Sequence, residues 1–177
     1  MRIRRLLPAD AGAFQDLRLR GLLESPTAFG SSYEEEVDRS IPAIAASLAE
    51  GSGRNMFGAL IDNQLVGVVG VGREPALKQL HRGFIRSMYV APQARGRGIG
   101  KALMQEAVHF ARAMPGLRQL TLTVTAGNSA ALATYKGFGF KVYGTAPAAL
   151  HVQGIYYDEI HMVYHLEDAI KETPPSA

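Results

Sequence analysis

The chain has no cysteine among its 177 residues, and this absence removes several kinds of chemistry at once. Disulfide bonds, thiolate metal sites and a cysteine nucleophile are all excluded. A chain without cysteine fits a reducing compartment. The sequence also lacks an apolar run near the roughly 18 residues of a membrane span, and its basic start has no apolar signal segment. We therefore expect a cytoplasmic protein with no membrane partner.

An excess of one charge is also missing. The chain carries 19 basic and 16 acidic residues, which gives a net charge of +3. This charge is too small and too dispersed to indicate nucleic-acid binding, although it allows a small anionic ligand to be held locally. Apolar residues make up 47% of the chain and charged residues 20%, as in ordinary globular proteins. The length fits one domain, which we place at residues 1–168, with a tail at 169–177.

Hydrophobic periodicity and turn residues predict a mixture of strands and helices. Strands are expected over residues 3–7, 55–61, 65–71, 84–90, 119–125, 137–143 and 155–166. Helices are expected over residues 10–20, 41–48, 101–113 and 128–136. Because several strands form hairpins rather than alternating with helices, the order favours an α+β fold over a doubly wound sheet.

The most informative stretch is the glycine-rich turn Arg95-Gly96-Arg97-Gly98-Ile99-Gly100. It follows a predicted strand and begins a predicted helix. Such a turn exposes backbone N–H groups without internal partners, and together with the helix dipole they form a phosphate site. An ordinary strand–helix turn is the alternative, but one glycine suffices for such a turn, whereas this one has three alternating glycines and two arginines. The turn therefore predicts a phosphorylated cofactor.

Two common phosphate-binding patterns do not fit this turn. A dinucleotide fingerprint that starts at Gly96 needs a sixth-position glycine, and Lys101 stands there. A P-loop needs glycine five residues before Gly100 and Ser or Thr after Lys101, where the chain has Arg95 and Ala102. Both the dinucleotide and the nucleoside-triphosphate readings are therefore disfavoured.

A third pattern fits. The segment Val90–Leu103 contains Arg95, Gly98 and Gly100 in the order Arg-x-x-Gly-x-Gly, and Asn128–Phe140 reads Asn-x-x-Ala-x-x-x-Tyr-x-x-x-Gly-Phe. Together these segments resemble the GCN5-related N-acetyltransferase (GNAT) family, and the resemblance covers residues 2–166. It implies the single-domain acyl-CoA N-acyltransferase fold, a mixed, mostly antiparallel twisted sheet flanked by helices. It also implies acetyl-CoA as co-substrate, with no metal.

By this resemblance, the glycine-rich turn binds the CoA pyrophosphate, and the strand before it separates from its neighbour to admit the pantetheine arm. Tyr135 would be the general acid that protonates the leaving thiolate, although a half-buried structural aromatic is the alternative. Asn128 is equally compatible with a plain helix cap. The expected cofactor-binding residues are Met88, Tyr89, Val90, Arg95, Gly96, Arg97, Gly98, Ile99, Gly100, Lys101, Asn128 and Tyr135.

The acceptor side is less defined by the sequence. Glu35 is a candidate general base within the acidic run of residues 34–36, for which a solvated helix turn is the alternative. Candidate acceptor-binding residues are Glu34, Tyr89 and Asp158, and other titratable candidates are His81 and His161. The expected activity is direct acetyl transfer to a primary amine in a ternary complex, by a monomer or homodimer. A non-catalytic acetyl-CoA sensor is the alternative function.

Overall fold

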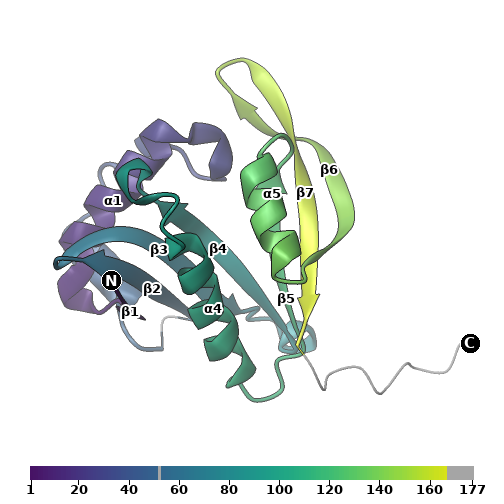
Figure 1. Cartoon of the computed structure of the whole chain (residues 1–177), viewed down its shortest axis with the longest axis horizontal. Helices are drawn as coiled ribbons and strands as arrows, with labels where there is room; N and C mark the ends of the chain where they lie inside the picture. Colours follow the sequence, from purple (N-terminus) through teal and green to yellow (C-terminus); the bar gives the residue numbers. More distant parts are fainter. Residues whose placement is uncertain (52, 167–177) are drawn as a thin grey trace, which may run out of the picture.

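A seven-stranded mixed sheet in the order β1-β2-β3-β4-β5-β7-β6 organises the chain in the computed structural model (Figure 1). The structure describes residues 1–51 and 53–166, so the predicted tail at 169–177 lies outside it. Neighbouring strands are antiparallel except β4 and β5, which are parallel. The strands are β1 (Arg2–Arg5), β2 (Arg54–Ile61), β3 (Gln64–Arg73), β4 (Arg82–Val90), β5 (Gln119–Thr125), β6 (Lys141–Val152) and β7 (Ile155–His165).

Helices pack on both faces of the sheet and produce two hydrophobic cores. One core joins α4 and α5 to the sheet through residues such as Leu103, Leu120 and Met162. The other joins α1 and α3 to the opposite face through residues such as Leu17 and Ile44. Burying one such side chain contributes about 1.5–3 kcal/mol. The helices are α1 (Ala11–Glu24), α2 (Tyr33–Glu36), α3 (Ile41–Leu48), α4 (Ile99–Arg112) and α5 (Ser129–Gly137).

The expected α+β class and the mixed, mostly antiparallel sheet are confirmed. The strand predicted over residues 137–143 is misplaced, since Gly137 still belongs to α5 and β6 starts at Lys141. Gly139 stands between them with a φ of 94°, a left-handed conformation that ends a helix rather than extending a strand. The acidic run also forms a short helix, α2, capped by Ser32. Among the described residues, no helix is long and apolar enough to cross a membrane.

The parallel strands β4 and β5 diverge along their length. They pair from Arg82 and Gln119 to Phe84 and Thr121. Farther along, β4 carries a bulge against β3 at Ser87, a non-glycine residue with a φ of 55°. A bulge bends its strand and redirects the following groups, and left-handed non-glycine residues concentrate at functional sites. Beyond Phe84 and Thr121 the two strands are not paired, which leaves a gap in the middle of the sheet.

Candidate functional site

Two cavities meet in the gap between β4 and β5. The first, of about 500 Å³, lies beside the glycine-rich turn, and we call it the turn cavity. The second, of about 450 Å³, is lined by Thr121, Thr123 and Thr125, and we call it the threonine cavity. Both are lined by Ala28, Phe29, Met88, Thr123, Thr125 and Tyr135. A molecule in one cavity can thus approach a molecule in the other at this junction.

The turn cavity has the backbone geometry of an anion site. Gly98, the N-cap of α4, has a φ of 74°, and Gly96 has a φ of 73°. The first hydrogen bond of the helix joins the Ala102 N–H to the Gly98 carbonyl at 3.0 Å. The N–H groups of residues 99–101 precede that bond and therefore have no partner within the helix. With the positive end of the α4 dipole, they favour a phosphate group.

Gly100 brings this turn close to β4. A Cβ atom at Gly100 would stand 3.3 Å from the terminal methyl of Met88 and 4.0 Å from a Val90 methyl. Gly96, Gly98, Ile99 and Gly100 all line the turn cavity. The glycines therefore serve two purposes, since two of them adopt left-handed conformations and the third allows close approach of helix and strand.

Arg95 and Tyr89 are tied to the end of α1 by one carboxylate. An Arg95 Nη2 lies 2.7 Å from Glu24 Oε1, and the Tyr89 hydroxyl donates a hydrogen bond to Glu24 Oε2. Arg95 Nε also donates to the Val90 carbonyl at 2.9 Å. Burial and then the neighbouring Glu24 raise the pKa of Tyr89 to about 12. Tyr89 and Arg95 thus fix the wall of the turn cavity from the α1 side.

The remaining sequence-predicted cofactor residues differ in their placement. Asn128 caps α5 by accepting a 3.1 Å hydrogen bond from the Ala131 N–H through Oδ1, and it also lines the turn cavity. The cap uses the amide oxygen and leaves the amide NH₂ as a donor for a ligand. Arg97 and Lys101 are exposed and are not among the residues that line either cavity.

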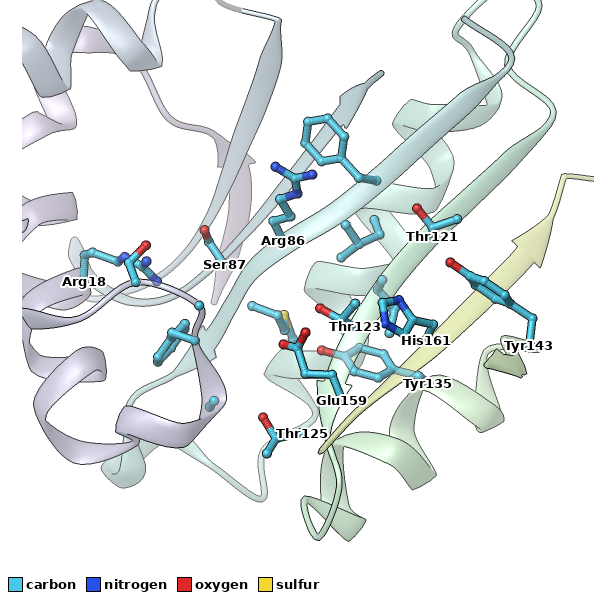
Figure 2. A pocket seen from close by; sticks show the side chains of 18 residues that line it. Arg18, Arg86, Ser87, Thr121, Thr123, Thr125, Tyr135, Tyr143, Glu159 and His161 are labelled. Atoms are coloured by element: carbon cyan, nitrogen blue, oxygen red, sulfur yellow. The ribbon is translucent and has the colours of Figure 1, made fainter. Parts of the chain in front are cut away.

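Tyr135 lies where the two cavities meet. The residue is only 8% exposed, and it lines both cavities. Burial raises its pKa to about 12, so the hydroxyl is protonated at neutral pH. Figure 2 shows this hydroxyl pointing into the space between Thr123 and Glu159. The geometry makes Tyr135 available as a proton or hydrogen-bond donor at the junction.

The threonine cavity has polar side chains from two paired strands. Thr125 of β5 pairs with Glu159 of β7, and Thr123 pairs with His161. Alternate residues of a strand share one face, so these side chains point to the same side of the sheet (Figure 2). The Thr125 hydroxyl donates to the Thr27 carbonyl and thereby ties the loop after α1 to β5.

Several acceptor-side candidates from the sequence lie elsewhere. Glu35 is exposed and accepts a 2.7 Å hydrogen bond from the Ser32 N–H, so it completes the cap of α2. Asp158 is exposed and accepts from the Ala148 N–H at 2.8 Å. Glu34 and His81 are exposed as well. None of these four residues is among those that line the two cavities.

Glu159 was missed by the sequence reasoning, although His161 was considered. Glu159 and His161 are both half-buried residues of the threonine cavity. The two-residue period of a strand could have identified it, because residues two apart share a face while Asp158 falls on the other parity. No group of three or more His, Asp or Glu residues that could hold a metal occurs in the part of the chain that the structure describes.

Comparisons with known proteins agree with this geometry. The sequence model described as "Acetyltransferase (GNAT) family" matches residues 20–140. An L-methionine sulfoximine/L-methionine sulfone acetyltransferase of Pseudomonas paraeruginosa is 31% identical over 81 residues, 46% of this chain and 46% of that protein. Streptothricin acetyltransferase of Streptomyces lavendulae is 40% identical over 80 residues, 45% of this chain and 41% of that protein. The chain thus matches a little less than half the length of these curated relatives.

Solved structures show the same fold. A GNAT superfamily phosphinothricin acetyltransferase from Sinorhizobium meliloti, in complex with acetyl-CoA, superposes with a TM-score of 0.83 at 22% identity. The superposition covers 98% of this chain and 92% of that one. The family match extends over more than half of the sequence, and it includes the glycine-rich turn and the Asn128–Phe140 segment. The chain therefore belongs to the acetyltransferase (GNAT) family.

Proposed function

We propose that the protein transfers the acetyl group of acetyl-CoA to a primary amine. The observation that carries this proposal is the meeting of an anion-binding cavity and a polar cavity at Tyr135 and Met88. A donor and an acceptor bound on the two sides would bring a thioester and an amine together, which supplies the proximity that transfer requires. The chain has no cysteine, so direct attack is favoured over a cysteinyl intermediate.

The turn cavity would hold acetyl-CoA. The backbone N–H groups at the start of α4 would bind the pyrophosphate, and the pantetheine arm would lie along residues 88–90 of β4. Asn128 would donate from its amide to the arm. A backbone N–H beyond the Ser87 bulge would polarise the thioester carbonyl and stabilise the oxyanion that forms there. No metal is needed for these roles.

The chemical step would use one group from each side of the junction. Glu159 accepts a proton from the acceptor ammonium, and the neutral amine then attacks the thioester carbonyl. The attack forms the C–N bond and gives the tetrahedral intermediate, a second amine proton passes to solvent, and collapse of the intermediate breaks the C–S bond. Glu159 then releases its proton to solvent. Tyr135 donates a hydrogen bond and a proton to the departing sulfur, and it is reprotonated from solvent.

Glu159 is favoured over Glu35 as the base because of its position. Glu159 lines the threonine cavity beside the junction, whereas the Glu35 carboxylate is engaged at the cap of α2. The relatives are named for different acceptors, L-methionine sulfoximine and streptothricin, so the family match does not select one acceptor. A cytoplasmic location and a monomeric or homodimeric state stay predictions.

Steady-state kinetics of Glu159→Gln test these roles. We expect kcat to fall by about 100-fold, within the range of a lost general base, with the KM for acetyl-CoA unchanged. Glu106→Gln on α4 is the matched control, and Glu35→Gln tests the competing base. Unchanged kcat in Glu159→Gln with a large loss in Glu35→Gln would transfer the role to Glu35. Binding of acetyl-CoA without turnover of any amine would support a sensor instead.

A further inference from the structure

The two walls of the threonine cavity carry opposite charges. Glu159 stands on the β7 wall, whereas Arg18 of α1 and Arg86 of β4 line the other side. Figure 2 shows Arg18, Ser87 and Arg86 on one side of the cavity and Glu159 with His161 on the other. A ligand that satisfies both walls must carry a cation and an anion.

Arg18 of α1 lines this cavity. The residue is only 8% exposed. Its Nε and Nη2 donate to the Glu36 carboxylate, with the Nη2–Oε1 distance at 2.8 Å. Its Nη1 is buried and has no hydrogen-bond partner within residues 1–51 and 53–166. Leaving a buried donor unpaired is unfavourable, and a ligand oxygen that reached Nη1 would satisfy it.

Near this wall, three arginines pair with two carboxylates, those of Glu36 and Glu74. Arg86 is 3.9 Å from Glu74, and its side chain is 65% exposed. Arg39 is 3.6 Å from Glu36, the carboxylate that also pairs with Arg18. Burial and then the charges of neighbouring arginines lower the pKa of Arg54. The guanidinium groups that interact in this cluster belong to Arg18, Arg39, Arg54 and Arg86.

We propose that the acceptor is a small zwitterion, whose amine is held at Glu159 and whose carboxylate is held by Arg18 and Arg86. This inference rests on the proposed acetyl transfer and specifies its acceptor class. Ser87, on the same wall, adds a hydroxyl donor. Charge-assisted hydrogen bonds are the stronger ones in proteins, and arginine suits carboxylate recognition. The basic wall therefore selects free amino acids over simple amines and over the N-termini of proteins.

The test compares matched acceptors. CoA release is measured with a set of α-, β- and ω-amino acids, with their carboxamides, with their decarboxylated amines, and with short peptides. We expect kcat/KM for the preferred amino acid to exceed that of its decarboxylated amine by about 10- to 100-fold, the value of one or two charged hydrogen bonds. Equal or better activity with the decarboxylated amines, the carboxamides or the peptides would overturn the proposal.

Arg86→Gln tests the wall itself, since this exposed side chain can change without disturbing the core. The variant should lose about 10- to 100-fold in kcat/KM for the amino acid. It should change activity on the decarboxylated amine by less than about threefold. Arg2→Gln on β1 is the control. Equal losses on both acceptors would contradict the carboxylate contact.

These outcomes distinguish the proposed carboxylate subsite at Arg18 and Arg86 from the acetyltransferase function. Turnover of simple amines without any advantage of the carboxylate would reject the subsite and keep the acetyltransferase. If no amine is acetylated, calorimetric titration with the N-acetylated amino acids decides the question for the subsite alone. Binding that is weakened in Arg86→Gln would support it, and no binding or unaltered binding would reject it.

Discussion

The Phe140 N–H donates a 3.1 Å hydrogen bond to the carbonyl oxygen of Tyr135. The Gly139 N–H donates to the Lys136 carbonyl at 2.9 Å, and the rings of Tyr135 and Phe140 pack with centroids 6.1 Å apart. This paired bonding with a left-handed glycine is a helix C-cap of the Schellman type. The Gly-Phe ending of the second sequence motif therefore fixes the last turn of α5, which carries Tyr135 to the junction.

Two glycines at this helix end should respond oppositely to alanine. Gly139 has a φ of 94°, and an added Cβ would stand 3.3 Å from the Tyr164 ring. Gly139→Ala should therefore lower the free energy of unfolding by about 1–2 kcal/mol. Gly137 is helical with open space around it, so Gly137→Ala should raise stability by about 0.5–1 kcal/mol. Urea unfolding measures both, and a stable Gly139→Ala would refute the cap.

Gly98→Glu should abolish binding of acetyl-CoA, because a carboxylate would occupy the anion site. The control is Gly116→Glu, which introduces the same side chain in a similar backbone conformation. The φ angle is 73° at Gly116 and 74° at Gly98, and an added Cβ meets open space at both positions. Both substitutions carry a similar backbone cost of about 1–2 kcal/mol. Calorimetric titration with acetyl-CoA should therefore show a loss in Gly98→Glu alone. Equal affinity in the two variants would move the pyrophosphate away from this turn.

Tyr135→Phe should reduce kcat by about 100-fold and leave the dissociation constant of acetyl-CoA within about threefold. The side chain must be protonated to donate, and burial raises its pKa to about 12. Deprotonation of Tyr135 would therefore reduce activity only near that pH, and the wild-type rate should not fall between pH 7 and pH 10 from this cause. A fall in kcat below pH 10 that occurs in the wild type but not in Tyr135→Phe would disprove the assignment.

Glu36 should make stability depend on pH in the acid range. Burial alone would raise its pKa, but the hydrogen bond and charge of Arg18 outweigh burial and the net pKa is lowered. The carboxylate therefore stabilises the fold above the unfolded value of about 4.3, and this stability is lost as the pH falls through the lower folded pKa. Glu36→Gln should cost about 3 kcal/mol at pH 7 and much less in acid.

The control for Glu36→Gln is Glu34→Gln, an exposed neighbour in the same helix turn. Urea unfolding at neutral and acidic pH should show a difference between the two variants that shrinks with acid. A difference that stays constant with pH would show that the Arg18–Glu36 pair does not act through its charge.

Much of the architecture could be predicted because local patterns dictate it. The alternation in β5 and the apolar face of α4 identify these elements directly. The glycine-rich turn is equally local, since left-handed backbone and close approach both demand glycine there. The boundary between α5 and β6 was wrong because Gly137 and Gly139 look alike in sequence, and the capping bonds select one of them.

The acceptor side could not be predicted for a different reason. Its side chains come from α1, β4, β5 and β7, which are far apart in the chain. Glu36 looked like part of an exposed acidic run, yet it is buried against Arg18. Glu35 was a candidate general base in the sequence, but its carboxylate completes the cap of α2. Such roles depend on packing between distant segments, which the sequence pattern does not encode.

The most direct test of the central claim is detection of the products. The protein is incubated with acetyl-CoA and a panel of primary amines that includes free amino acids, and both the released thiol and the N-acetylated product are measured. We predict equal amounts of free CoA and N-acetyl product, with both nearly lost in Tyr135→Phe. Tight binding of acetyl-CoA without any acetylated amine in the panel would contradict the account.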